Sequence, residues 1–176
     1  MKLFMKSGMI VDLTDIDPSC ITLEDIAHNL SNSCRFNGGC NRFYSIAEHS
    51  VNVSTTVADK HAKAALMHDA HEAYTGDIVR PILEVIDDTD IRYLRRYFNV
   101  AIAKRFYMVP SILECKEVLE SDNTWLHIEG ALFFSKWEKF EHIDYAKYYP
   151  RIQYLKPEAA KKLFLERFSY VQSLHV

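Results

Sequence analysis

The sequence predicts an all-α domain, and three observations support this. Long segments carry apolar residues at helical spacing, and no pair of short alternating segments makes a convincing hairpin. Hydrophobic residues make up 48% of the 176, which suits one substantial core. Because no Gly/Ser-rich or Pro-rich tract separates one part of the chain from another, we expect a single domain over residues 1–176.

The first half of the chain is expected to hold a lead-in and three helices. Residues 1–20 alternate only weakly and should be irregular or briefly extended. A helix should begin at Thr22-Leu-Glu-Asp25, which resembles a capping box, and stop at Asn37-Gly-Gly39. Two further helices are expected over residues 44–59 and 61–74.

The second half is expected to hold three more helices. Residues 90–106 carry apolar side chains at helical spacing. A long helix should follow Pro110, over residues 111–134. The last should cover residues 157–173, where a proline occupies a favourable first position.

The charge composition of the chain argues against a nucleic-acid polymer as its partner. The net charge is -3, from 21 basic and 24 acidic residues that are well mixed along the chain. The most basic stretch, Arg92-Tyr-Leu-Arg-Arg96, is interpreted as the solvated face of a helix. We therefore expect a small-molecule partner.

Cysteine usage and hydropathy indicate the compartment. The four cysteines, at positions 20, 34, 40 and 115, show neither a Cys-x-x-Cys spacing nor the density of a disulfide framework. No signal-peptide core and no membrane span of roughly 20 apolar residues occurs. The sequence thus predicts a cytoplasmic protein without membrane contact, in the host cytoplasm if the gene is viral.

The chemistry is expected to centre on His68-Asp69, inside an Ala-rich predicted helix. Adjacent helical residues point about 100° apart, but one cation at the edge of the helix can bridge them. Glu72 lies four residues after His68 and three after Asp69, which places a second carboxylate on the same face. A lone His-Asp pair cannot hold a divalent ion well, so other segments must complete the site, and His49 and Asp122 are available.

Four separated motifs in this order resemble the HD-domain phosphohydrolase superfamily. They are Ser-Ile-Ala-Glu-His-Ser up to residue 50, His68-Asp69, Thr75-Gly-Asp77, and Asp-x-x-x-Leu-x-x-Glu over residues 122–129. The resemblance runs from about residue 23 to 134. It is closest to the small branch that contains phage dATP triphosphohydrolases and bacterial 5'-deoxynucleotidases.

The resemblance implies an HD-type helical bundle around a central metal site. The implied ligands of the ion are His49, His68, Asp69 and Asp122. This mixed set of imidazoles and carboxylates suits Zn, Mn, Fe or Co about equally, and a second ion such as Mg is an open alternative. An unpartnered buried polar group would cost about 1 to 3 kcal/mol, and a metal would resolve several such costs together.

Two acids next to the implied ligands are expected to be catalytic. Glu72 is placed to orient a water or to carry a proton to the leaving oxygen. The resemblance implies that Asp77 accepts a hydrogen bond from the sugar. The bland alternatives are a solubilising charge at Glu72 and a helix cap at Asp77.

Several residues are expected to bind substrate. In the nucleotidase branch an Arg-Trp pair occupies the place of Arg35-Phe36, with the arginine near phosphate and the aromatic ring near the sugar or base. Arg42 and Arg80 are further phosphate candidates, because a guanidinium matches phosphate oxygens at two points. The loop over residues 34–44 is polar and glycine-rich, and its length leaves it free to cover a site.

One departure from the branch concerns the phosphates. The triphosphohydrolases tend to carry lysines where this chain has Leu83 and Leu119, which disfavours a triphosphate. Lys116 is close enough in sequence to substitute.

These observations predict a metal-dependent phosphohydrolase of 2'-deoxynucleotides, most simply a dNTP (dATP-type) triphosphohydrolase. The alternatives are a 5'-deoxynucleotidase that acts on monophosphates and a non-catalytic metal- or nucleotide-binding module.

The remaining histidines are expected to be solvent-facing or hydrogen-bonded: His28, His61, His71, His127, His142 and His175.

Aromatic residues in the last third predict a homo-oligomer, a dimer or a hexamer. If exposed, they would leave more apolar surface than a monomer of this size usually shows. They are Phe133, Phe134, Trp137, Phe140 and the tyrosines from Tyr145 to Tyr149.

Overall fold

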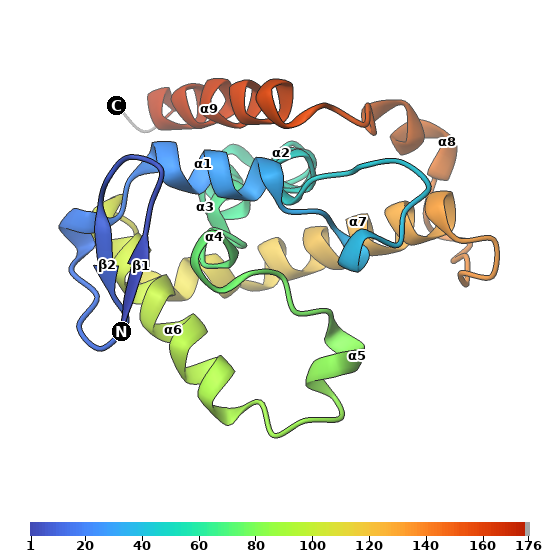
Figure 1. The fold of residues 1–176 in the computed structure, drawn as a ribbon. Coiled ribbons are helices and arrows are strands. Elements are labelled where there is room, and N and C mark those ends of the chain that lie inside the picture. The colour runs from blue at the N-terminus through green and yellow to red at the C-terminus, as the bar shows by residue number, and fades with distance from the viewer. Residues whose placement is uncertain (175–176) are drawn as a thin grey trace.

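The computed structural model describes residues 1–174 and is built mainly of helices, as Figure 1 shows. The predicted all-α character is confirmed at this level. The α-helices are α1 (Leu23–Asn32), α2 (Ile46–Ser54), α3 (Asp59–Met67), α4 (Glu72–Thr75), α5 (Arg80–Leu83), α6 (Thr89–Arg105), α7 (Lys116–Phe133), α8 (Tyr145–Tyr148) and α9 (Pro157–Ser173). Across residues 1–174 no helix is both long and apolar enough to cross a membrane. His175 lies outside the described residues.

The centre of the fold is α2, which packs against α1, α3, α7 and α9. Every residue from Tyr44 to Ser54 is buried, so the polar side chains of α2 need partners inside the protein. Ser45 Oγ caps the helix by accepting the Glu48 backbone N–H at 3.1 Å. The Glu48 carboxylate accepts the backbone N–H groups of residues 153–155 at 2.6 to 3.1 Å. These bonds fix the helix that carries His49.

Helix α9 lies across α1 and α2, at the top of the view in Figure 1, and also contacts α3. Its bounds are those predicted from the sequence. Three of its own residues, Ala160, Phe164 and Val171, are fully buried. At the end of α2, Arg167 donates to the Ser54 backbone oxygen and hydroxyl. Helix α9 therefore holds the central helix from the side opposite to α7.

A short β-hairpin precedes the helices, so the expectation that no hairpin occurs was wrong. β1 (Lys2–Phe4) pairs antiparallel with β2 (Ile10–Asp12), and Gly8 turns the chain at a φ of 87°. Strands of three residues are too short to show alternation in sequence. The hairpin is stabilised by tertiary contacts instead, because Val11 is fully buried and Asp25 of α1 binds the turn.

Three predicted helices end earlier or break. Helix α1 has the predicted Thr22 cap but stops at Asn32, where the chain turns to pair residues 34 and 45. Helix α2 stops at Ser54, and the hydroxyls of residues 54–56 bond back to backbone oxygens. Such bonds compete with the helical hydrogen bonds. The predicted helix over residues 61–74 breaks after Met67 into a tight turn and then α4.

The long helix after Pro110 also begins later than predicted. Residues 110–114 form a 3-10 turn, and Cys115 is extended with ψ of 158°, so α7 starts at Lys116. The short helices α5 and α8, four residues each, had no periodic signal in the sequence. Figure 1 shows α5 set apart from the other helices, on the chain between α4 and α6.

The aromatic residues of the last third are not an exposed surface, which corrects the basis of the oligomer prediction. All of them except Trp137 belong to a second apolar cluster around Tyr44, Trp125 and Ile128. Phe134 and Trp137 stack with ring centroids 6.0 Å apart. The exposed apolar side chains lie elsewhere, and among them are Phe4 and Ile10 on the hairpin and Ile82, Val85 and Ile86 near α5.

Candidate metal centre and cleft

Four predicted metal ligands meet where α2, the turn after α3 and α7 converge. His49 Nε2 lies 3.1 Å from Asp122 Oδ1 and 3.8 Å from Asp69 Oδ2. His68 Nε2 lies 3.1 Å from Asp69 Oδ2 and 3.6 Å from Asp122 Oδ1. The ligand atoms of His49, His68 and Asp122 all fall within 4.8 Å of one another. Residues far apart in the sequence thus form one cluster that could hold a metal ion.

In both imidazoles the Nδ1 atom has a hydrogen-bond partner that leaves Nε2 suited to bind a metal. His49 Nδ1 lies 2.6 Å from Glu129 Oε1, and His68 Nδ1 lies 2.8 Å from the Ala65 backbone oxygen. Since a carboxylate and a carbonyl only accept, each Nδ1 carries the proton and each Nε2 can offer its lone pair to a metal. His68 Nε2 is buried and has no hydrogen-bond partner among the described residues. The donor set therefore fits a divalent transition metal.

The electrostatics of the cluster favour a cation. Burial disfavours charge on both imidazoles, yet the nearby carboxylates of Glu129, Asp69 and Asp122 raise the pKa of His49 and, more strongly, of His68. Burial would raise the pKa of Asp69 and Asp122, but the two histidines lower both. Both pKa directions mean that positive charge is favoured among these carboxylates, which is the charge that a divalent ion would bring.

The turn after α3 explains how His68 and Asp69 share one point. Ala70 N bonds to Met67 O at 3.0 Å and Glu72 N bonds to Asp69 O at 2.9 Å, so the helix tightens to i→i+3 bonds. Side chains three apart eclipse in such a turn. Asp69 and Glu72 therefore lie on the same side more closely than a regular α-helix would place them.

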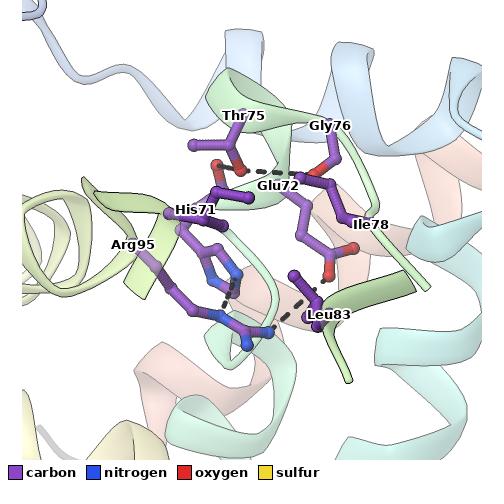
Figure 2. A pocket seen from close by; sticks show the side chains of 8 residues that line it. His71, Glu72, Thr75, Gly76, Ile78, Leu83 and Arg95 are labelled. Atoms are coloured by element: carbon purple, nitrogen blue, oxygen red, sulfur yellow. Dashed lines mark hydrogen bonds and ion pairs between the residues drawn. The ribbon is translucent and has the colours of Figure 1, made fainter. Parts of the chain in front are cut away.

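Glu72 lies beside the cluster without joining its closest contacts. It is 8% exposed, and its Oε2 has no hydrogen-bond partner among residues 1–174. Burial, together with the negative charges of Asp69 and Asp77, raises the pKa of Glu72 well above its ordinary value. Its other oxygen, Oε1, lies 3.8 Å from Arg95 Nη2, as the dashed line in Figure 2 shows.

A cleft of about 610 Å³ opens over the His/Asp cluster. This volume is in the range of small-molecule sites. Acidic residues of the site line it, namely Asp69, Glu72, Asp77 and Asp122. Its apolar wall includes Phe36, Leu126, Phe134 and Trp137. Three arginines, Arg35, Arg80 and Arg95, also reach the cleft.

Arg35 is held at the inner end of the cleft. Its Nη2 donates to Glu129 Oε2 at 3.2 Å, and its Nη1 lies 3.7 Å from Asp69 Oδ2. Phe36 packs edge-on against Phe134 at 5.3 Å and against Trp137 at 5.9 Å. The loop over residues 34–44, which its length left free to cover a site, supplies part of the cleft wall.

The structure places two predicted substrate residues outside the cleft. The Arg42 guanidinium stacks 4.2 Å from the Tyr154 ring centroid. Lys116 is 81% exposed at the start of α7 and lies 3.7 Å from Glu120. Neither residue lines the cleft. Arg80 and Asp77 do line it, and burial raises the pKa of Asp77.

Two contributors, Glu129 and Arg95, had no role assigned from the sequence, although Glu129 ends the motif over residues 122–129. Glu129 lies two helical turns after Asp122, and that seven-residue spacing on one face was an available signal. Arg95 was interpreted as solvated helix surface, and no sequence signal places it, because only the packing of α6 brings it to the cleft.

Two further histidines have partners. His71 is buried, and its Nε2 accepts a hydrogen bond from Arg95 Nε at 2.5 Å. Burial and the Arg95 charge lower the pKa of His71 to about 3. His61 contacts Cys115 at 3.7 Å and Glu117 at 3.8 Å, a second group of metal-ligand types apart from the cleft.

Comparison with known proteins identifies the family. The chain is 32% identical over 166 residues to the uncharacterized protein YfdR of Escherichia coli K12, covering 90% of this chain and 89% of YfdR. The chain belongs to the YfdR family. It is also 40% identical over 91 residues to an uncharacterized protein of Rhodobacter capsulatus, covering 47% of this chain and 46% of that protein. No family model matches the chain.

Proposed function

We propose that this YfdR-family protein is a metal-dependent phosphohydrolase that acts on 2'-deoxynucleotides. The observation that carries the proposal is one arrangement. Two imidazoles whose Nε2 atoms face two carboxylates form a cluster beneath a cleft that also presents arginines. Such a cleft suits a phosphorylated small molecule, because its cations match phosphate oxygens and its apolar wall accepts a base or sugar.

His49, His68, Asp69 and Asp122 would hold the ion. When bound, a divalent metal supplies Lewis-acid polarisation of a phosphoryl oxygen and activates water near neutral pH. Burial and the neighbouring carboxylates raise the pKa of Glu72, which suits it to give a proton to the leaving oxygen. Arg35 neutralises charge that develops on the phosphate, while its bond to Glu129 keeps it oriented.

Recognition of the nucleoside is proposed for the outer part of the cleft. Phe36 and Trp137 offer aromatic faces, and Asp77 accepts a hydrogen bond from the sugar. The preference for a deoxynucleotide, with dATP as the first candidate, rests on the resemblance of the motifs to the HD-domain branch. The helical domain itself is accordingly proposed to be an HD-type bundle.

One observation favours the alternative of a 5'-deoxynucleotidase. Leu83 lines the cleft, and Lys116 does not reach it, so neither position adds a cation for a phosphate chain. The cluster, Glu72 and the cleft serve both reactions equally well.

Phosphate release over a panel of nucleoside mono- and triphosphates, repeated with Zn, Mn, Fe, Co and Mg, tests the proposal. Chromatography of products from dATP separates the two reactions, because one releases a triphosphate chain and the other acts on monophosphates alone. Turnover of no nucleotide with any of these metals would reject the enzyme and leave the binding module.

A homo-oligomer in the cytoplasm is proposed to be the working form. The apolar side chains exposed near α5, Ile82, Val85 and Ile86, are candidates for its interface. A light-scattering mass near 20.5 kDa at micromolar concentration would contradict it.

A further inference from the structure

Arg95 lines the cleft together with the acid Glu72 and lies beside it. It comes from α6, a helix that carries none of the predicted site residues. Figure 2 shows its side chain extending from α6 toward His71 and Glu72, with Leu83 nearby. Arg95 lines the large cleft and also a neighbouring niche of about 20 Å³.

One end of the Arg95 guanidinium is fixed. Its Nε donates to His71 Nε2 at 2.5 Å, and His71 is buried two residues after Asp69. The bond therefore ties the orientation of Arg95 to the turn that carries the proposed metal ligands. An arginine held at Nε loses less side-chain freedom when it binds a ligand, so more of the contact energy appears as affinity.

The other end of the guanidinium is open. Its terminal nitrogens make no hydrogen bond within the described residues, and the ion-pair contact to Glu72 Oε1 is long, at 3.8 Å. The side chain is 41% exposed, so these donors reach the cleft. An arginine has five N–H donors, and after the bond from Nε the four terminal ones are left for a ligand.

The cleft needs such a cation. Of the three arginines that line it, Arg35 is already committed to Glu129 and Asp69. Arg80 is exposed, and its side chain makes no hydrogen bond or ion pair among residues 1–174. Arg95 alone among these three combines a fixed orientation with open donors.

We propose that Arg95 is a substrate-binding residue that grips a phosphate oxygen through its terminal N–H groups and places the phosphate next to Glu72. This rests on the proposed function, since it takes the ligand of the cleft to be a phosphate compound. It also supplies a cation on the wall that Leu83 leaves apolar, which restores a triphosphate as a reasonable substrate.

The experiment compares Arg95→Ala with Arg96→Ala. Arg96 is the next residue on α6, is exposed and does not line the cleft, so both variants lose one positive charge from the same helix. Inorganic tripolyphosphate is titrated into each purified protein by calorimetry. Because hydrogen bonds to charged groups are the stronger ones, Arg95→Ala should bind roughly 10- to 100-fold more weakly, and Arg96→Ala should bind like the wild type.

Arg95→Lys separates charge from geometry. A lysine keeps the charge but cannot bond His71 while presenting a planar pair of donors, so its affinity should fall between the wild type and Arg95→Ala. Equal thermal melting of the variants shows that each is folded. Where nucleotides are turned over, KM should rise more than kcat falls in Arg95→Ala.

The outcomes separate the two proposals. Tripolyphosphate affinity in Arg95→Ala equal to that in Arg96→Ala overturns the role of Arg95, whatever the activity of the wild type. No measurable binding of tripolyphosphate to the wild type overturns it as well. If Arg95→Ala loses tripolyphosphate affinity as expected but the wild type turns over no nucleotide, the phosphate-binding role of Arg95 is supported and the phosphohydrolase activity is rejected.

Discussion

His49 Nδ1 and Glu129 Oε1 lie 2.6 Å apart, both fully buried, and join α2 to α7 behind the candidate metal site. The contact orients the His49 ring so that Nε2 faces Asp69 and Asp122. Glu129 also accepts from Tyr44 and Arg35, so a single carboxylate sets the position of a proposed metal ligand and of a cleft arginine. Conversion of Glu129 to glutamine removes this charge with little change in shape.

We expect Glu129→Gln to weaken metal affinity about 10- to 100-fold, the usual effect of losing a carboxylate behind a metal-bound histidine. Competition with a chelator of known affinity measures the change. Tyr44→Phe is the control, because it removes another partner of Glu129 and leaves the carboxylate on His49. Equal affinity in Glu129→Gln and wild type would show that the ring of His49 needs no such support.

Purified protein should carry close to one tightly held transition metal per chain, and Asp69→Ala should lose it. The remaining three ligands would leave the site incomplete and less neutralised. Elemental analysis measures occupancy, and a Cys115→Ser background excludes metal held by the His61, Cys115 and Glu117 group. Full occupancy in Asp69→Ala would refute the ligand assignment.

Glu72→Ala and Glu72→Gln should keep the metal and lose most turnover. A positioned acid-base group typically contributes about 10²- to 10⁴-fold in rate. Metal content, nucleotide affinity and kcat are measured on the same preparation, and affinity should change far less than kcat. Near-normal kcat would make Glu72 a bystander. Loss of the metal together with activity would make it a ligand, in line with a second ion shared with Asp69.

Asp25→Asn should destabilise the fold at neutral pH and much less in acid. Asp25 is buried, which raises its pKa, but hydrogen bonds from Ser7 and Thr22 outweigh burial and lower it below 3.8. A lowered folded-state pKa means that the stabilisation is complete above the unfolded value and is lost as the pH falls toward the folded value.

Urea unfolding at pH 7 and near pH 3 measures this difference. We expect a loss of about 1–3 kcal/mol at pH 7, since Asp25 joins the β1–β2 turn to the cap of α1. Asp15→Asn is a control that removes an exposed carboxylate from the same segment. A difference between Asp25→Asn and wild type that stays constant with pH would contradict the assignment.

Local sequence signals determined much of the helical fold. Thr22 caps α1 because its hydroxyl accepts the Asp25 N–H, a bond that depends only on neighbouring residues. The bounds of α9 follow from Pro157 and from apolar residues at helical spacing, and both signals are local as well. The sequence alone shows that His68 and Asp69 are adjacent and that Glu72 follows one turn later. The order of the motifs indicated His49 and Asp122 as further metal ligands.

Tertiary structure decided the rest, because long-range packing has no local signature. The predicted helix over residues 61–74 breaks at His68, and the packing of α4 against α1, with Asn29 bonded to Ala73 O at 2.7 Å, holds the turn that aligns Asp69 with Glu72. The β1–β2 hairpin exists because α1 binds its turn. Arg95 reaches the cleft, and Lys116 stays outside it, through the directions of α6 and α7 alone. The amino-acid sequence determines what chemistry each side chain can offer. Only the packing of whole helices determines which other groups lie within its reach.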